Sequence, residues 1–363
     1  MFIMNVLIMT GKFGMGHVSA AASVKEKIEY RDPSAVVHIV DIMDVFPREL
    51  SSLAYLGFNS LVNKCPKIYN HFNKLSELHA WFPMKRIVAR GIGRMVKEYD
   101  PDIIISTVPF SGMFVSTYMK YTHNEIPLIS CITDISFHKA WLSPKTKAYT
   151  VGSGSLKARL VREGIPAGSV FVTGIPVKER FTEVKRAETG RRKRVLLMGG
   201  GLGLISSADG LMDALSGMDD VDVTVITGKN KKLQTELSEK YPDAEIIGFT
   251  DKVSDYMAEA DLLISKAGGI TMFEAIDSET PMLVIKPFLE QEAGNAKFME
   301  RRGIGKVIWN KDADIGAEIK ALLSDDKALN EMKTNMKTIT DEIGGTDINT
   351  VIGDLGYREE AVS

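Results

Sequence analysis

The chain has 363 residues, of which 44% are hydrophobic and 25% charged, a composition typical of a soluble globular protein with room for two α/β domains. Its net charge of -2 excludes a global electrostatic field that would attract nucleic acid. No run of about 18 apolar residues occurs, so no segment is expected to span a membrane.

In the first half of the chain, short apolar runs alternate with longer helical patterns. The predicted strands are 6–9, 36–41, 103–107 and 126–132, and the predicted helices are 20–30, 84–98 and 112–121. Near-continuous apolar strands predict a sheet covered on both faces, and the alternation predicts parallel strands. The first run passes straight into a glycine loop without a cleavage-site pattern, so we expect a buried strand rather than a signal peptide.

A polar and basic stretch then interrupts the pattern before the alternation restarts. The later predicted strands are 195–198, 221–226, 246–248, 262–265 and 282–285, and the later predicted helices are 208–216 and one from about 270. The sequence therefore predicts two Rossmann-like, doubly wound α/β domains with a ligand cleft between them. Their expected bounds are 1–176 and 194–345, with a linker at 177–193 and a C-terminal helix in 346–363 that packs back on the first domain.

Charge is distributed unevenly along the chain. Residues 45–97 contain nine basic and two acidic residues, a net charge of +7, so the remainder carries about -9. Aromatic and apolar residues are interleaved with these basic residues. Such a composition suits either anionic lipid headgroups or ordinary amphipathic helices with a solvated basic face. The two cysteines, Cys65 and Cys131, form neither a metal-ligand pattern nor a disulfide framework, which fits a reducing compartment.

A glycine loop follows the first predicted strand and leads into a helix, with the sequence Gly11-Lys12-Phe13-Gly14-Met15-Gly16-His17. Glycines such as Gly16 allow a tight turn, and the N-terminus of the following helix attracts an anion. The spacing differs from the dinucleotide GxGxxG pattern, because His17 stands where that pattern would continue. His17 lies at the carboxyl end of a strand, where α/β proteins build their sites, so it is either a structural or a catalytic histidine.

Polar and aromatic residues also cluster after the predicted strand 126–132. Asp134, His138 and Trp141 lie there within eight positions of one another. They form either a catalytic cluster, with Asp134 and His138 as its candidates, or an Asx turn that caps a helix while Trp141 belongs to the core.

Two further glycine turns lie in the second half. The first contains Gly200 and Gly201 and is either a ligand-binding turn or tight packing between a strand and a helix. The second follows strand 262–265 with the residues Ser265, Lys266, Ala267, Gly268, Gly269, Ile270 and Thr271. Small residues there would expose the N-terminus of a helix to a diphosphate.

Three polar residues downstream strengthen the second of these turns as a candidate site. Glu274 lies one turn inside the helix, where it is either a ribose ligand or a solvated acid. Gln291 and Asn295 are four residues apart and would share one face of a helix, a spacing that suits a polyhydroxylated sugar.

Taken together and in this order, these motifs resemble those of the monogalactosyldiacylglycerol synthases and the bacterial processive diacylglycerol glucosyltransferases. The resemblance covers nearly the whole chain and is carried by the following residues: Gly14-Met15-Gly16-His17 with Ala21-Ala22, Thr133-Asp134 with His138 and Trp141, Thr173-Gly174-Ile175-Pro176-Val177, Lys266-Ala267-Gly268-Gly269-Ile270-Thr271 with Glu274, and Gln291-Glu292 with Asn295.

The resemblance implies a GT-B fold and an inverting glycosyltransferase that moves a hexose from a UDP-sugar to a membrane lipid. The implied donors are UDP-glucose, UDP-galactose or UDP-GlcNAc, and the implied acceptor is diacylglycerol or another lipid. No cofactor and no essential metal are expected. The implied location is cytoplasmic and peripheral, on the inner face of the cell membrane, through an anionic surface bound by residues 45–97.

The resemblance also implies roles for individual residues. His17 is the expected general base, a task that suits a neutral imidazole near pH 7. The expected donor ligands are Gly268 and Gly269 for the diphosphate, Glu274 for the ribose, Phe249 and Thr250 for the uracil, and Gln291, Glu292 and Asn295 for the sugar. Relatives carry Gly before the Gln-Glu pair, whereas this chain has Glu290, which places the donor sugar in question.

Two other functions fit the same motifs. One is a soluble UDP-GlcNAc 2-epimerase, which shares the fold but needs no basic aromatic stretch. The other is a protein that senses a UDP-sugar without turnover and acts through a protein partner.

Overall fold

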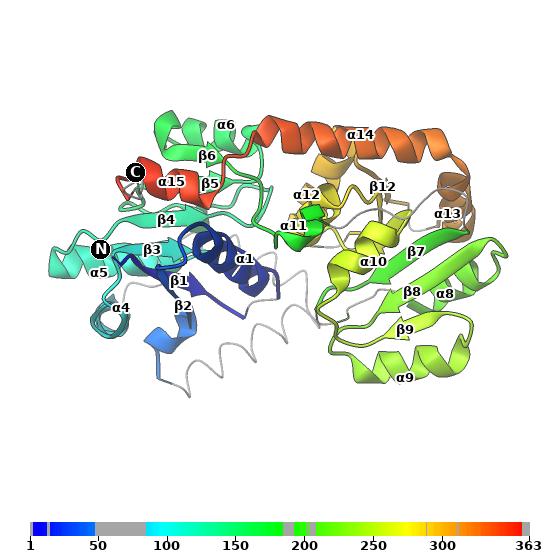
Figure 1. Ribbon diagram of the computed structural model, residues 1–363, viewed down its shortest axis with the longest axis horizontal. Coiled ribbons are helices and arrows are strands. Elements are labelled where there is room, and N and C mark those ends of the chain that lie inside the picture. Colours follow the sequence, from blue (N-terminus) through cyan, green and yellow to red (C-terminus); the bar gives the residue numbers. More distant parts are fainter. Residues whose placement is uncertain are drawn as a thin grey trace. The chain divides into compact units, whose positions relative to one another are not determined.

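The computed structural model describes residues 3–12, 15–47, 85–183, 192–201, 203, 208–287, 289–310 and 312–357. The chain forms two units, one from residues 1–178 with 345–363 and one from residues 179–344. Each unit contains one six-stranded sheet whose paired strands are all parallel, as the sequence predicts (Figure 1). Part of the expected linker is structured, because α7 (Arg180–Glu183) and the first residue of β7 fall within it.

The first unit is built on a sheet with the strand order β2 (Val36–Asp41), β1 (Asn5–Thr10), β3 (Ile103–Ser106), β4 (Leu128–Cys131), β5 (Ala148–Val151) and β6 (Val170–Val172). Its helices are α1 (Met15–Arg31), α4 (Lys85–Tyr99), α5 (Ser111–Thr122), α6 (Gly154–Arg162) and α15 (Ile348–Asp354), with the 3-10 turns η1 (Ile42–Val45), η3 (Lys139–Trp141) and η4 (Ala167–Ser169).

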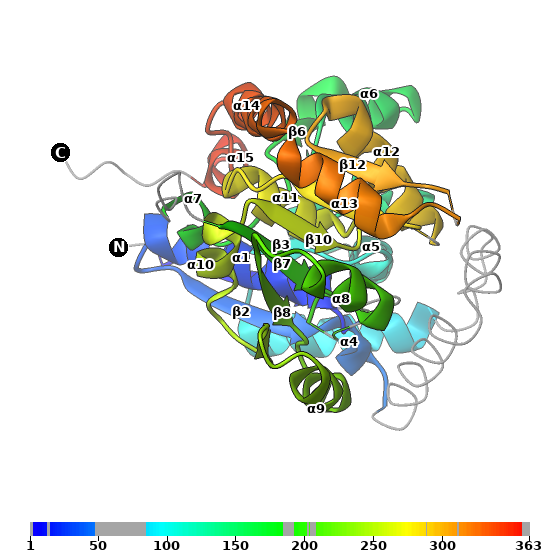
Figure 2. The ribbon, with the colours of Figure 1, turned by 90° about the vertical axis from the view of Figure 1, so that its right-hand side faces the viewer.

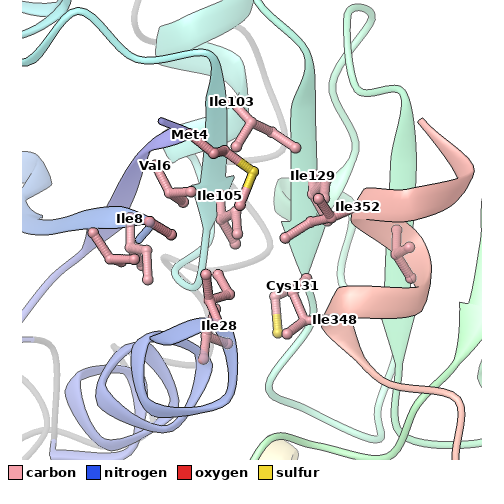
Figure 3. Packing of buried hydrophobic residues seen from close by; sticks show 14 of the residues in the cluster. Met4, Val6, Ile8, Ile28, Ile103, Ile105, Ile129, Cys131, Ile348 and Ile352 are labelled. Atoms are coloured by element: carbon pink, nitrogen blue, oxygen red, sulfur yellow. The ribbon is translucent and has the colours of Figure 1, made fainter. Parts of the chain in front are cut away.

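One face of this sheet is covered by α1 and by α15, which comes from the C-terminal end of the chain. Ile348 and Ile352 of α15 pack in the same buried cluster as Ile129 and Cys131 of β4 (Figure 3). Ile28 of α1 belongs to this cluster too. The C-terminal segment thus completes the core of the first unit rather than that of the second.

The opposite face of the sheet is covered by η1, α4 and α5. In α4, buried Val88, Ile92 and Met95 recur at the spacing of one helical face, which gives the helix its apolar side. Gly91 is required between them, because a Cβ there would lie 2.4 Å from the carbonyl oxygen of Val45. The glycine therefore lets α4 lie directly on η1.

The second unit has the strand order β12 (Gly305–Ile308), β11 (Met282–Ile285), β10 (Leu262–Ser265), β7 (Lys193–Met198), β8 (Val221–Ile226) and β9 (Glu245–Ile247). Its further helices are α8 (Ala208–Ser216), α9 (Lys231–Lys240), α10 (Val253–Glu259), α11 (Gly269–Asp277), α12 (Glu290–Arg302), α13 (Ile315–Ser324) and α14 (Asp326–Ile343).

Helices α8, α9 and α13 share one core cluster with β7, β8 and β10, in which Leu211, Leu237 and Ile319 are representative members. Figure 2 shows α8 and α13 next to one another beside this sheet. Alternate strand residues such as Leu196 and Leu263 are also fully buried, so the sheet is covered on its other face as well.

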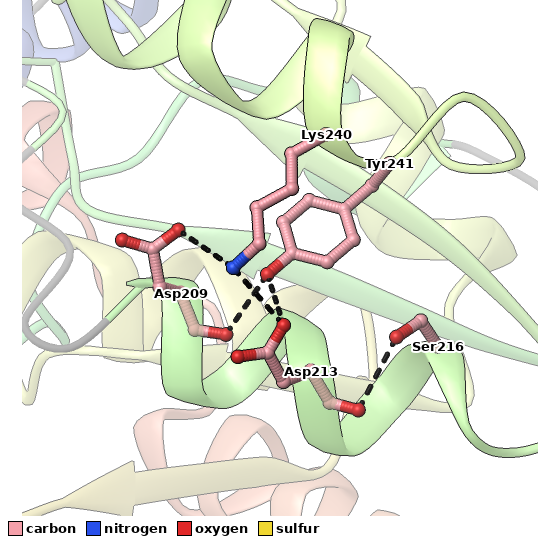
Figure 4. Close-up of polar contacts among 5 residues, drawn as sticks. All are labelled: Asp209, Asp213, Ser216, Lys240 and Tyr241. Carbon is pink, nitrogen blue, oxygen red and sulfur yellow. Dashed lines mark hydrogen bonds and ion pairs between the residues drawn. The ribbon is translucent and has the colours of Figure 1, made fainter.

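A polar cluster ties the end of α9 to α8 (Figure 4). The Tyr241 hydroxyl donates to Asp213 at 2.6 Å and lies 3.1 Å from the carbonyl oxygen of Asp209. Lys240 forms ion pairs with the same two aspartates. Because Tyr241 and then Lys240 bind its carboxylate, the pKa of Asp213 is lowered.

The strands and helices predicted from the sequence are all present, with small differences at their ends. The predicted strand 126–132 is shorter, because only residues 128–131 pair with neighbours, and helices α1 and α5 begin before their predicted starts. Strands β5, β6 and β12 have no predicted counterpart. Among the described helices, none is both long and apolar enough to cross a bilayer.

Candidate functional site

Polar loops converge in each unit where the chain order of the strands reverses. In the first unit the reversal lies between β1 and β3, because β2 lies on one side of β1 and the later strands lie on the other. In the second unit it lies between β7 and β10. Loops that leave a sheet at such a point diverge and form a crevice, which is where open α/β sheets bind ligands. The three predicted glycine turns, which contain Gly16, Gly200 and Gly268, follow β1, β7 and β10.

His17 lies in the first turn of α1, directly after the exposed Gly16. Its Nδ1 is 3.0 Å from the carbonyl oxygen of Thr107 and 2.9 Å from the hydroxyl oxygen of Thr133. Because a carbonyl oxygen only accepts hydrogen bonds, Nδ1 carries the proton and donates a hydrogen bond to the carbonyl oxygen of Thr107. The neutral ring then has its lone pair on Nε2, so Nε2 is the nitrogen that can accept a proton from a substrate hydroxyl.

Burial lowers the pKa of His17 below its ordinary value, while the negative charge of Asp134 and the hydrogen bond to Thr107 act in the opposite direction. The imidazole is therefore neutral at pH 7, as a general base must be. Asp134 is itself buried. Its charge favours the imidazolium that forms when His17 accepts a proton. Two of the predicted catalytic residues are thus electrostatically coupled.

Trp141 packs beside this pair. Its ring centre lies 6.3 Å from that of His17, with 59° between the two ring planes. The side chain is 3% exposed and belongs to a core cluster that includes Leu156 and Leu160. The expectation that Trp141 is a core residue is confirmed, and its ring also forms one wall beside the imidazole.

His138, the other predicted catalytic residue, caps η3. Its Nδ1 accepts a hydrogen bond from the N–H of Ala140 at 3.2 Å. An accepting Nδ1 places the proton of the neutral ring on Nε2, which is the opposite arrangement to that in His17. His138 can therefore donate a hydrogen bond from Nε2 in this tautomer, but it cannot act there as a base.

The glycine turn after β7 combines tight packing with an open side. Gly203 has φ 64°, and a Cβ there would lie 1.9 Å from the carbonyl oxygen of Thr227, so this position requires glycine. Gly200 has φ 70°, yet a Cβ there would meet no described residue within 4 Å. Gly201 accepts the N–H of Lys229 at 3.1 Å. The packing interpretation therefore applies to Gly203, whereas Gly200 faces open space that a ligand can approach.

The turn after β10 presents the N-terminus of α11. The N–H of Gly268 donates to the carbonyl oxygen of Lys266 at 2.8 Å, which makes a very tight turn. Gly268 is the N-cap of α11, and as a glycine it has no side chain that could occupy the first N–H groups of the helix. A partial positive charge and unoccupied donors at this point are what a diphosphate requires. Ile270 is buried behind the turn, and Thr271 is half-buried.

Asn295 does not have the surroundings expected of a sugar ligand. Its side chain has no exposed surface, and its Nδ2 donates to the carbonyl oxygen of Ala267 at 2.8 Å. Gln291, one turn earlier on α12, is exposed. Helix α12 turns Asn295 inward, where it holds the glycine turn from behind, and the contact of Gln291 and Asn295 with a sugar stays a prediction.

Glu292 is also buried, and its carboxylate lies 3.7 Å from Nζ of Lys266. Together with Asn295, this ion pair joins α12 to the turn after β10. Glu274, on α11, is half-buried. Glu290 is exposed in the first turn of α12, where the helix dipole stabilises an acidic side chain.

Phe249, expected to line a uracil pocket, is 62% exposed. An aromatic ring with an open face is a suitable stacking surface for a nucleobase such as uracil. Nearby, the hydroxyl of Thr250 accepts the N–H of Lys252 at 3.1 Å. Nζ of Lys229 lies 5.7 Å from the centre of the Phe249 ring. Lys229 has no distinctive sequence signal, because it follows a single glycine in a stretch with several lysines.

Part of the basic stretch is visible on α4. Its exposed cations recur every three or four residues and so form one stripe along the helix: Arg86, Arg90, Arg94 and Lys97. Ile87, 44% exposed, lies beside this stripe. Lys85, the first residue of α4, is half-buried, and the other four basic residues of the stretch lie outside the described residues: Arg48, Lys64, Lys67 and Lys74.

Comparison with known families covers both units. The profile of the monogalactosyldiacylglycerol (MGDG) synthase family matches residues 17–177, and that of the glycosyltransferase family 28 C-terminal domain matches residues 196–343. A processive diacylglycerol beta-glucosyltransferase of Bacillus cereus (strain AH187) is 30% identical over 92% of this chain and 89% of the relative.

Solved structures show the same fold at much lower sequence identity. MurG of Acinetobacter baumannii matches with a TM-score of 0.58 and 15% identity, over 97% of this chain and 98% of that chain. A UDP-N-acetylglucosamine 2-epimerase matches with a TM-score of 0.58 and 16% identity, over 99% and 98%. The expected GT-B fold is confirmed. Since an epimerase shares it, the fold alone does not choose between transfer and epimerisation.

Proposed function

Because this chain belongs to the family of the processive diacylglycerol beta-glucosyltransferases, we propose that it is an inverting glycosyltransferase that moves a hexose from a UDP-sugar to diacylglycerol. The observation that carries the proposal is the similarity over 92% of the chain, since it includes both units. The arrangement around His17 adds a chemical argument, because its Nε2 is free of the Nδ1 proton and can accept the proton of an acceptor hydroxyl.

In the first unit, we assign the acceptor to the crevice beside His17. Nε2 of His17 takes the proton of the acceptor hydroxyl while that oxygen attacks the anomeric carbon of the donor. The positive charge that develops on the imidazole is stabilised by the Thr107 carbonyl, by the Thr133 hydroxyl and by the charge of Asp134. Donation from Nε2 of His138 is available to a second oxygen of the acceptor.

In the second unit, we assign the donor to the turns after β7 and β10. The bond between the anomeric carbon and the diphosphate oxygen breaks, and the electron pair leaves with UDP. The N-terminus of α11 stabilises this charge through N–H groups that need no reorganisation. Phe249 stacks on the uracil, Glu274 binds the ribose and Gln291 contacts the sugar. Direct attack from the side opposite to UDP inverts the anomeric carbon.

The leaving diphosphate needs a positive charge to stabilise it. We propose that the protein supplies this charge and that transfer requires no metal. Lys266 and the N-terminus of α11 lie at the same turn and supply that charge. Activity that survives complete chelation of divalent cations is the expected result, and abolition by a chelator with recovery on addition of Mg²⁺ would contradict it.

Access to a lipid acceptor requires the enzyme to work at a membrane. We propose that the basic stripe on α4 contributes to binding anionic headgroups on the cytoplasmic face of the cell membrane. Each Lys or Arg near such a surface adds roughly 1 kcal/mol. Exposed Ile87 beside the stripe adds an apolar contact at the interface.

The proposed function is tested by incubating the protein with UDP-glucose, UDP-galactose and UDP-GlcNAc, one at a time, in anionic vesicles that contain diacylglycerol. Mass spectrometry of the extracted lipids should show one or more added hexoses with one of the donors. Absence of any glycosylated lipid with all three donors would reject the proposal. The identity of the accepted donor also tests whether Glu290, which replaces the glycine of relatives, changes donor preference.

The same samples distinguish the two other functions. Conversion of UDP-GlcNAc to its 2-epimer without lipid product identifies an epimerase. Tight UDP-sugar binding with neither product identifies a sensing protein.

A further inference from the structure

Lys229 lies in the turn after β8, at the junction of two parts of the donor site proposed above. Its backbone N–H donates to the carbonyl oxygen of Gly201 at 3.1 Å, and its Nζ is 5.7 Å from the centre of the Phe249 ring. The turn that contains Gly201 is assigned to the donor, and Phe249 is assigned to its uracil. The backbone of Lys229 is therefore hydrogen-bonded to the Gly201 turn, and its side chain extends over the Phe249 ring.

The backbone around Lys229 is held firmly in place. Gly228 has φ 55°, and a Cβ there would lie 2.7 Å from the carbonyl oxygen of Gly201. The N–H of Thr227 donates to the carbonyl oxygen of Ile247 at 2.8 Å. On the other side, the Asn230 side chain caps α9 by accepting an N–H at 3.1 Å. The backbone of Lys229 is thus fixed against the Gly201 turn, while its side chain is exposed and long enough to reorient.

The proposed donor carries its negative charge on the diphosphate, which joins the nucleoside to the sugar. The N-terminus of α11 offers a diphosphate only about half a positive charge, and the charge of Lys266 at the same turn is shared with Glu292. A lysine ammonium is a compact full charge, and its hydrogen bonds to phosphate are among the stronger ones in proteins. Lys229 is close enough to Phe249 to contact the nucleotide on the side where the base meets its phosphates.

We propose that Lys229 is a phosphate-binding residue of the donor site, which recognises the diphosphate of a nucleoside-diphosphate sugar. This inference rests on the proposed function, since it takes a UDP-sugar as the ligand. It distinguishes Lys229 from its neighbours Lys231 and Lys232, which begin α9. Lys232 is engaged with Glu236 one turn along that helix, at 3.6 Å.

Binding of UDP by calorimetry and of uridine by ligand-observed NMR tests the inference on the full chain. Lys229→Met should weaken UDP roughly tenfold or more and leave uridine within about twofold, because uridine has no phosphate. Lys229→Arg keeps the charge and should retain UDP affinity within about threefold. Lys231→Met is the matched control, since Lys231 is also exposed and should not affect either ligand.

Three results would overturn the inference alone: UDP affinity unchanged in Lys229→Met, equal losses for UDP and uridine, or equal effects of Lys229→Met and Lys231→Met. Failure of the unchanged protein to bind UDP would instead overturn the donor assignment and this inference with it. A thermal unfolding midpoint for Lys229→Met equal to that of the parent protein confirms that the fold is intact.

Discussion

At the scale of single residues, local hydrogen bonds give His17 and His138 opposite tautomers. The Thr107 carbonyl oxygen accepts from Nδ1 of His17, whereas the Ala140 N–H donates to Nδ1 of His138. Hence Nε2 is a proton acceptor in His17 and a donor in His138. This division of roles follows from backbone groups, which any residue type could supply, so it has no sequence signature.

The tautomer of His17 predicts the pH dependence of transfer. The neutral ring is the active form, and burial lowers its pKa below about 6.5, the value of a solvated imidazole. Activity should therefore be constant from neutral pH down to below pH 6.5 and then fall as His17 becomes protonated. Measurement of kcat/KM against pH with saturating vesicles checks this.

Thr133→Val and His17→Ala make the pH experiment specific. The valine removes an acceptor that stabilises imidazolium, so the acidic limb should move to lower pH, and Thr133→Ser should restore it. His17→Ala should lower kcat about 10²- to 10⁴-fold with UDP affinity unchanged. An acidic limb that lies above pH 6.5, or that does not move in Thr133→Val, contradicts the assigned tautomer.

At the scale of elements, α12 supports the turn that opens α11. Glu292 and Asn295 on its buried side contact Lys266 and the Ala267 carbonyl oxygen. The spacing of polar residues along α12 correctly predicted a helix. It could not predict which side faces inward, because burial depends on how α12 packs against β12 and α11. The predicted contact of Asn295 with a sugar rests on its spacing from Gln291, whereas the structure places its side chain behind the turn.

Asn295→Leu is predicted to damage donor binding indirectly. The substitution leaves the buried Ala267 carbonyl oxygen without the Asn295 donor, which costs about 1–3 kcal/mol. We expect the free energy of unfolding to fall by this amount and the Kd for UDP to rise, because the turn loses its support. Lys297→Ala, at an exposed position of the same helix, is the control. Unchanged UDP affinity in the destabilised variant would show that Asn295 supports only the fold.

The exposed side of α4 yields a prediction about membrane binding. Arg86→Gln combined with Arg90→Gln removes two charges from the stripe and should weaken partition onto anionic vesicles roughly 30-fold, from about 1 kcal/mol per charge. Lys231→Gln with Lys232→Gln, on α9 of the other unit, controls for net charge. Sedimentation with vesicles measures both. Equal losses in the two double variants would exclude a specific role for α4.

At the scale of the whole molecule, the chain begins and ends in the same unit. Helix α15 returns to the first sheet, where Ile348, Val351 and Ile352 are each at most 3% exposed. The hydroxyl of Tyr357 also donates to the carbonyl oxygen of Asp102 at 2.9 Å. The stability of the first unit therefore depends on residues that follow the second unit in the sequence.

Ile352→Ala tests this dependence. Removal of this buried side chain should cost about 2–5 kcal/mol and lower the unfolding midpoint of the first unit by about 5–15 °C. Because Ile352 packs only in the cluster of the first unit among the described core clusters, binding of UDP to the second unit should persist at temperatures where transfer is lost. Asp354→Ala, at an exposed position, should change neither property. Loss of UDP binding in parallel with transfer would show that the two units unfold together.

The sequence by itself determined nine of the described strands, β1–β4 and β7–β11, the parallel sheets and the glycine turns that follow β1, β7 and β10. These features depend on local patterns, such as apolar runs of strand length and glycines after a strand, which neighbouring residues are sufficient to create. His17 and the Gly268 turn were found in this way. The resemblance to known families also rests on these motifs, because their order along the chain can be read from the sequence.

Only the tertiary structure decided which side chains face one another. The contact of His17 with Thr107 and Thr133 joins residues 90 and 116 positions apart. Burial of Asn295, the position of Lys229 over Phe249 and the return of α15 to the first sheet likewise join distant segments. Such contacts depend on the packing of whole elements, and a single sequence records which residues can form them but not which ones meet.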